Sequence, residues 1–142
     1  MARIYKISDR IPVKIDDLTI TISPLTIDQK TEIQQYMIES RLNRDIRLAT
    51  KGVVSAIKYS VKGVSGIVDS SGHPYNLEFD SNGHLTDACV NDLLNLENHS
   101  KLALVCSSLI QGIPEEFVDE QGRKLEGVEF LNNHSEPAEK NG

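Results

Sequence analysis

The sequence predicts a small domain of the α+β class, because stretches with a strand-like pattern and stretches with a helical pattern occupy separate parts of the chain. Near the N-terminus, over residues 13–22, apolar and polar residues alternate. Over residues 27–62, apolar residues recur every three or four positions. The chain has 142 residues, 39% hydrophobic and 25% charged, and such a chain can bury one aliphatic core without disulfides or metals.

An N-terminal β-hairpin is expected between Ile4 and Ile22. Its two strands, Val13–Ile15 and Leu18–Ile22, flank the turn-forming pair Asp16-Asp17. The second strand alternates strictly between apolar and polar residues, which predicts that one face of the hairpin is buried.

Two longer helices are expected next. Thr26 fits an N-cap, and Gln29 stands three residues later, as in a capping box. The first helix then continues to a break near Asn43. The second helix is predicted from about Arg44 to Lys62, with its apolar residues on one side.

A central β-hairpin is predicted over Val64–Phe79, around a loop of turn residues at 69–74. Two short helices follow. Thr86 can cap the first, which would run through Leu94, and Ser100 can cap the second, from Lys101 to about Gln111. No internal repeat is evident along the chain.

We expect residues 1–117 to form a single compact domain and residues 118–142 to form an acidic, flexible C-terminal tail. The chain from residue 115 onward holds eight acidic and three basic residues, against thirteen and twelve before it. The part after Asp119 has few apolar residues, so it is predicted to be dispensable for folding. The nearly neutral domain argues against general nucleic-acid binding.

Catalytic sequence motifs are absent, which predicts a protein that is not an enzyme and has no cofactor. The four histidines fall in predicted turns or in the tail, where we expect exposed side chains. Cys89 and Cys106 lie in apolar helical patterns, so we expect buried free thiols. With no secretory signal and no apolar run of ~20 residues, the expected location is a reducing cytoplasm, away from membranes.

Residues 78–89 follow the first half of a calcium-binding loop, with oxygen-bearing side chains at positions 1, 3 and 5 and glycine at position 6. The second half differs, since Cys89 stands where calcium needs a bidentate carboxylate. We therefore expect a turn after a strand, and no metal site.

Two surface patterns are candidates for partner binding. Basic residues recur at helical spacing along the second helix and can face solvent or an acidic protein partner: Arg44, Arg47, Lys51, Lys58 and Lys62. The first and last helices carry more apolar residues than one stripe needs, among them Met37, Leu42 and Leu104. Such helices are either sandwiched in the core or form a groove for a partner helix.

The order of the segments resembles that of tail assembly chaperones of long-tailed bacteriophages. The segment Lys62–Tyr75 contains Gly-Ile-Val-Asp-Ser-Ser-Gly-His-Pro, similar to a glycine–hydrophobic–Asp–Gly–Pro hairpin of that family. Pro24-Leu25-Thr26 resembles the helix entry of that family, and Gly112-Ile113-Pro114 resembles its stop after the short helices. The resemblance spans roughly Ile4 to Val128 and consists of loose motifs in a shared order.

This resemblance implies a viral protein in the host cytoplasm that coats the apolar, helical tape measure protein until the tail tube polymerises. A longer form in that family recruits tail tube subunits, and the family offers no catalytic residues. Two alternatives stay open: a structural virion component (tail, neck or capsid-surface protein), and a small enzyme with a dispersed site. The oligomeric state is not predicted.

Overall fold

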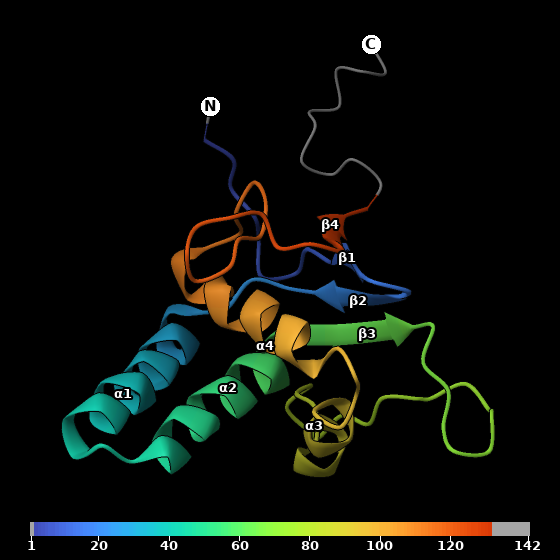
Figure 1. The fold of residues 1–142 in the computed structure, drawn as a ribbon, viewed down its shortest axis with the longest axis horizontal. Coiled ribbons are helices and arrows are strands. Elements are labelled where there is room, and N and C mark those ends of the chain that lie inside the picture. Colours follow the sequence, from blue (N-terminus) through green and yellow to red (C-terminus); the bar gives the residue numbers. More distant parts are fainter. Residues whose placement is uncertain (1, 132–142) are drawn as a thin grey trace.

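The computed structural model describes residues 2–131 of the chain. It has mixed α and β structure, as predicted, with helices packed against one antiparallel sheet (Figure 1). Along the chain, two strands are followed by two helices, a third strand, two shorter helices and a fourth strand.

The predicted N-terminal hairpin is confirmed. Strands β1 (Ile11–Ile15) and β2 (Leu18–Ile22) pair antiparallel, with Ile15 opposite Leu18. Asp16 takes a left-handed conformation in the connecting turn, with φ 54°. Alternate residues of both strands are buried, so one face of the hairpin forms a wall of the core.

The sheet has the order β3-β2-β1-β4, and its two outer strands differ from the prediction. Strand β3 (Val61–Ser65) follows a helix directly and pairs with β2. The end of the predicted second helix and the start of the predicted central hairpin both lie in this strand. Pairing with β2 satisfies the backbone of β3, while Val61 enters the core, and a continued helix would give neither.

Strand β4 (Val128–Phe130) pairs with β1, so the predicted boundary between domain and tail at residue 117 is too early. Leu125 and Val128 are buried, which makes part of the predicted tail a wall of the core. This segment has few apolar residues and was therefore predicted to be a tail. Its apolar residues, however, lie beside the edge of β1, where β4 can pair. The rest of the predicted tail, residues 132–142, lies outside the described residues.

The two longer helices are confirmed and lie side by side (Figure 1). Helix α1 (Ile27–Asn43) begins at the predicted capping box, in which Thr26 and Gln29 each accept a hydrogen bond from the backbone of the other. Helix α2 (Ile46–Ser60) is capped by Asp45 and ends two residues earlier than predicted.

Two short helices are also present. Thr86 caps α3 (Asp87–Leu93) as predicted, through a hydrogen bond from the backbone of Cys89. Helix α4 (His99–Ser108) continues into the 3₁₀ turn η1 (Leu109–Gln111). Its N-cap residue is Asn98 and not Ser100, and the Asn98 side chain makes no capping hydrogen bond.

In place of the predicted central hairpin, the chain forms short turns of one shared design, and a third copy lies near the C-terminus. Each is closed by a single antiparallel bridge. The bridge joins Val68 to Pro74 in the first turn, Phe79 to Leu85 in the second turn and Val118 to Lys124 in the third turn. The turns thus form an internal repeat that the sequence analysis did not predict, with the pattern apolar–Asp–x–x–Gly–His or Arg.

The aspartates explain why this pattern makes a turn. One carboxylate oxygen each of Asp69, Asp80 and Asp119 accepts hydrogen bonds from the backbone N–H groups two and four residues later. The glycine three residues after each aspartate adopts φ between 80° and 85°, which a side chain disfavours. These local bonds tighten the turns and leave only short strand pairs beside them.

The core is one aliphatic cluster between the sheet and the helices. The inward face of β1 and β2 supplies six of its residues, and α2, α3 and α4 cover them. Cys89 and Cys106 are buried in this cluster as free thiols, as predicted. Burial raises the pKa of the Cys106 thiol to about 12, so this group stays uncharged at neutral pH.

Candidate functional site

Helix α1 has more apolar surface than the fold covers. Its only buried residue is Ile33. Three other aliphatic side chains are largely exposed: Ile27 at 79%, Ile38 at 50% and Leu42 at 77%. A helix that serves a single core normally buries one apolar stripe and presents polar residues elsewhere. The outer side of α1 therefore suits contact with another molecule.

A cleft of about 430 Å³ runs between α1 and the junction of α4 with η1. We call it the Met37 groove. It is lined by Gln34, Met37, Ile38, Arg41, Ser107, Ser108, Ile110 and Gln111. Arg41 is the sole charged residue in this lining, and no ion pair among the described residues involves it.

The position of Met37 depends on a glycine of the neighbouring helix. Gly52 of α2 is buried, and a Cβ atom added there would lie 2.7 Å from Cε of Met37. The absence of a side chain at Gly52 thus lets Met37 lie against α2. Methionine is flexible and polarizable, so the wall it forms can adapt to differently shaped apolar side chains.

Of the residues predicted for partner binding, only Met37 lines this groove. Leu42 lies further along α1 and is exposed, whereas Leu104 is partly buried and packs against the core. Ile38 and Arg41 were not predicted as site residues. Their spacing from Met37 puts all three on one side of a helix, and this signal was available in the sequence. The opposing wall, with Ile110, comes from η1, and no residue spacing in the sequence links it to Met37.

The predicted basic stripe is divided by the fold. Lys58 forms an ion pair with Asp87 of α3, with 2.6 Å between Nζ and Oδ1. Lys62 lies in β3, and its Nζ donates to the backbone oxygen of Gly83 at 3.0 Å. Burial lowers the pKa of Lys62. Both lysines therefore act within the molecule, where they hold the second turn and α3 near α2.

The other basic residues lie near the tip of the helical hairpin. Arg44 is the left-handed C-cap of α1 and so does not continue the face of α2. Arg47 pairs with Asp45 at 3.2 Å, while Lys51 is exposed on α2. The hydrogen bonds from Arg47 lower the pKa of Asp45. The tip remains basic, and it follows the Met37 groove along α1.

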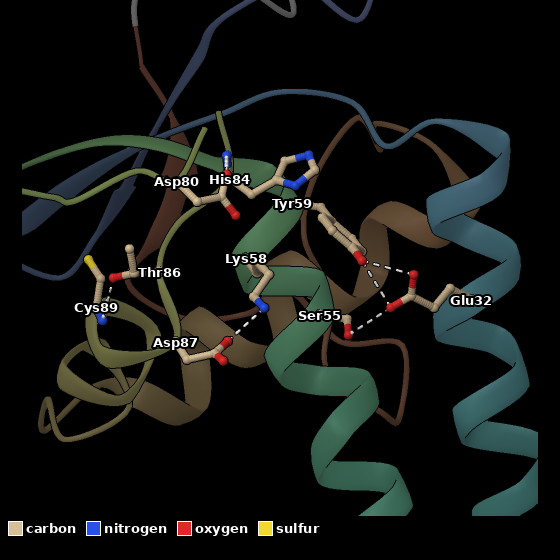
Figure 2. A network of polar contacts seen from close by, with 9 residues as sticks. All are labelled: Glu32, Ser55, Lys58, Tyr59, Asp80, His84, Thr86, Asp87 and Cys89. Carbon is tan, nitrogen blue, oxygen red and sulfur yellow. Dashed lines mark hydrogen bonds and ion pairs between the residues drawn. The ribbon is translucent and has the colours of Figure 1, made fainter. Parts of the chain in front are cut away.

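A group of polar residues joins α1 to α2 (Figure 2). Tyr59 donates to the carboxylate of Glu32, with 2.8 and 2.9 Å from its hydroxyl to the two oxygens. The hydroxyl of Ser55 donates to the same carboxylate at 3.3 Å. None of the residues that line the Met37 groove belongs to this group, and its polar atoms hydrogen-bond to one another. It is suited to tether the two helices.

His84 extends this tether to the second turn. Its ring lies edge-on to that of Tyr59, with 4.8 Å between the ring centroids (Figure 2). Nε2 of His84 is 3.5 Å from Nε2 of Gln29. The prediction of an exposed turn histidine is wrong here, because packing against Tyr59 partly buries the ring. The turn itself was predicted.

Replacing Tyr59 by Phe is expected to reduce the dependence of stability on alkaline pH. Burial and the hydrogen bond to Glu32 raise the pKa of Tyr59 from 10.0 to about 12. The folded state favours the neutral hydroxyl. The contribution of this hydroxyl to the free energy of unfolding is therefore complete below pH 10 and is lost as the pH rises towards 12.

Urea unfolding of both proteins at pH near 9 and near 11.5 measures the change in their free energies of unfolding. These two pH values span most of the range over which the contribution of Tyr59 is lost. The stability advantage of the natural protein over Tyr59→Phe should shrink at the higher pH. An advantage that is equal at both pH values would contradict the assigned pKa.

The calcium-like segment at residues 78–89 forms the second turn and the start of α3. The backbone N–H groups of Asn82 and His84 both donate to Oδ1 of Asp80, so this oxygen is already engaged. The hydrogen bond from the His84 backbone is the main reason that the pKa of Asp80 is lowered. Cys89 is buried in α3. Within residues 2–131, no group of three or more His, Cys, Asp or Glu side chains is placed to hold a metal ion.

Comparison with known proteins adds no assignment to this geometry. No family model, no curated protein and no solved structure matches the chain. Among the residues that the structure describes, no helix is both long and apolar enough to cross a membrane. The surfaces described above are therefore the basis for a functional proposal.

Proposed function

We propose that this protein is an assembly chaperone that holds an apolar, helical protein partner in the Met37 groove. The observation that carries the proposal is the unused apolar surface of α1 beside that groove, where Ile38 is half exposed and Leu42 is largely exposed. The sequence resemblance to phage tail assembly chaperones names the partner class: a tape measure protein, with the tail tube protein as a second partner.

The size and lining of the groove support reversible binding. A buried Leu or Ile side chain of the partner would contribute about 1.5–3 kcal/mol. A cleft of about 430 Å³ accommodates a few such side chains. Association and side-chain ordering consume much of that gain, so the complex should dissociate when the tube displaces the chaperone.

The charges at the groove favour an acidic partner. Arg41 lies in the lining and pairs with no acidic residue of the described chain, and Arg44 and Lys51 lie further along the hairpin. These exposed cations would attract acidic residues that flank the apolar positions of the partner helix. Screening at high salt should slow association but leave the apolar contacts intact.

Co-expression with the tape measure protein of the same phage tests the proposal. The natural chain should raise the soluble fraction of the tape measure protein several-fold, and Ile38→Asp should abolish most of that gain. Ile27→Asp is the matched control, because Ile27 is exposed on the same helix but does not line the groove. It should retain the gain.

Ile38 is a better test position than Met37 or Leu104, since both of those pack inside the molecule and their replacement would also destabilise it. A tape measure protein whose solubility is independent of the chain would contradict the proposal. A stoichiometric amount of the chain in mature virions would favour a structural tail, neck or capsid-surface protein instead.

A further inference from the structure

A second cleft, of about 550 Å³, lies between the segment that enters the first turn and the C-terminal half of α3. We call it the Asp92 pocket. It is lined by Ile67, Val68, Asp69, Ser70, Tyr75, Asp92, Leu93, Asn95 and Leu96. It shares no residue with the Met37 groove. Its walls are mainly apolar, and its charged residues are both aspartates.

Asp92 is held in a fixed orientation by Tyr75. The Tyr75 hydroxyl donates to Oδ2 of Asp92 at 2.7 Å, and Sγ of Cys89 lies 3.4 Å from the same hydroxyl. Burial, followed by these two contacts, raises the pKa of Tyr75, so the hydroxyl remains a donor at physiological pH. No donor within residues 2–131 bonds to the other oxygen of Asp92, Oδ1, which can therefore accept from a bound partner.

Neither aspartate of the pocket is neutralised by a lysine or an arginine of the described chain. The ion pairs among the described residues do not include Asp92. Asp69 uses Oδ1 for its own turn and has His73 at 3.9 Å, a longer contact than a hydrogen bond. The pocket thus has negative charge beside apolar walls, and no lysine or arginine of residues 2–131 forms an ion pair with it.

The apolar walls have room for an aliphatic chain. Val68 is 63% exposed at the rim, while Tyr75 and Leu96 are partly exposed. Arginine and lysine combine an aliphatic stem with a cationic end, which matches such a pocket in both respects. An anionic ligand would face two carboxylates, and a purely apolar one would leave Oδ1 of Asp92 without a partner.

We propose that the Asp92 pocket binds an arginine or lysine side chain of a protein partner. The stem would lie along Val68, Leu93 and Leu96, and the cationic end would donate to Oδ1 of Asp92. A charge-assisted hydrogen bond to this pre-oriented carboxylate is stronger than a neutral one, and a guanidinium is more weakly hydrated than an ammonium, so arginine should be preferred to lysine. This inference does not depend on the partner proposed for the Met37 groove.

Two small probes of equal shape test the pocket in the full-length protein. Pentylguanidinium carries the aliphatic stem and the charge of arginine, whereas pentylurea keeps the shape without the charge. Binding is followed by NMR on isotope-labelled Ile, Leu and Val methyl groups. We expect pentylguanidinium to shift the methyl signals of Val68, Leu93 and Leu96 and to bind about tenfold more tightly than pentylurea.

The variant Asp92→Asn should remove most of this preference, because it keeps an acceptor for Tyr75 but loses the charge. Glu120→Gln is the matched control: it removes one exposed carboxylate outside the pocket and should leave both affinities unchanged. Equal affinities of the two probes, methyl shifts confined to other sites, or an unchanged preference in Asp92→Asn would each overturn the proposal.

Discussion

A chain that ends at Asp119 is expected to lose most of its stability and its cooperative unfolding. The truncation removes β4 from the edge of β1 and takes Leu125 and Val128 out of the core. These two side chains alone account for about 3–6 kcal/mol at 1.5–3 kcal/mol each. The total stability of a domain is only about 5–15 kcal/mol, so the loss approaches the whole. Urea unfolding followed by circular dichroism measures it.

A chain that ends at Leu131 is the matched control for this truncation. It keeps β4 and removes only the part of the predicted tail that lies outside the described residues. If the prediction of a dispensable tail applies to that part, this chain should unfold at the same urea concentration as the intact protein. An Asp119 truncation that also unfolds there would show that β4 contributes nothing to the fold.

Gly127→Ala is expected to destabilise the protein more than Gly122→Ala does. Gly127 has φ 80°, and an added Cβ would overlap the carboxylate of Asp16 and lie 3.0 Å from Nζ of Lys101. Asp16 cannot easily give way, because it pairs with Lys101 at 2.7 Å and also accepts a hydrogen bond from Asn98. The backbone of Gly127 in turn accepts a hydrogen bond from Asp16.

The variant Gly122→Ala measures the cost of the backbone conformation alone, without a steric overlap of the added Cβ atom. Gly122 has a similar φ of 82°, but no atom lies within 4 Å of an added Cβ. It should therefore cost only the strain of the left-handed backbone, about 1–2 kcal/mol. Gly127→Ala should cost roughly twice as much or more, since the overlap adds to the same strain.

A double-mutant cycle identifies the cause. In an Asp16→Gly background the overlapping carboxylate is gone, and the left-handed conformation at residue 16 is still permitted. The cost of Gly127→Ala should then fall to that of Gly122→Ala. A cost that is unchanged in this background would mean that Asp16 is not the group that Gly127 accommodates.

The features that could be predicted from sequence were those set by neighbouring residues. Thr26 and Gln29 stand three residues apart, and this spacing alone specifies the cap of α1. The β1–β2 hairpin was predicted for the same reason, because its alternation and its turn lie within a dozen residues. The three Asp-x-x-Gly turns belong to this class too: their bonds are all local, and their shared pattern was visible but not recognised.

The candidate sites were less predictable, since each is built from distant segments. Met37 could be suspected from α1 alone, but Ile110, which completes its groove, comes from the far side of the chain. The Asp92 pocket joins the first turn to α3 by a hydrogen bond between Tyr75 and Asp92, and neither residue stood out in the sequence. The predicted basic stripe is divided for the same reason, because Asp87 of α3 and the backbone of Gly83 engage two of its lysines.

Local residue patterns were enough to predict the class of the fold, the capped starts of α1 and α3, and the buried free thiols, because side-chain spacing and hydrophobicity act over a few residues. Long-range pairing, in contrast, makes strands of Val61–Ser65 and Val128–Phe130. Val128 pairs with Ile15, more than a hundred residues away, and a three-residue strand has no preference strong enough to reveal itself. It becomes a strand because β1 offers it unsatisfied backbone groups and a core to enter.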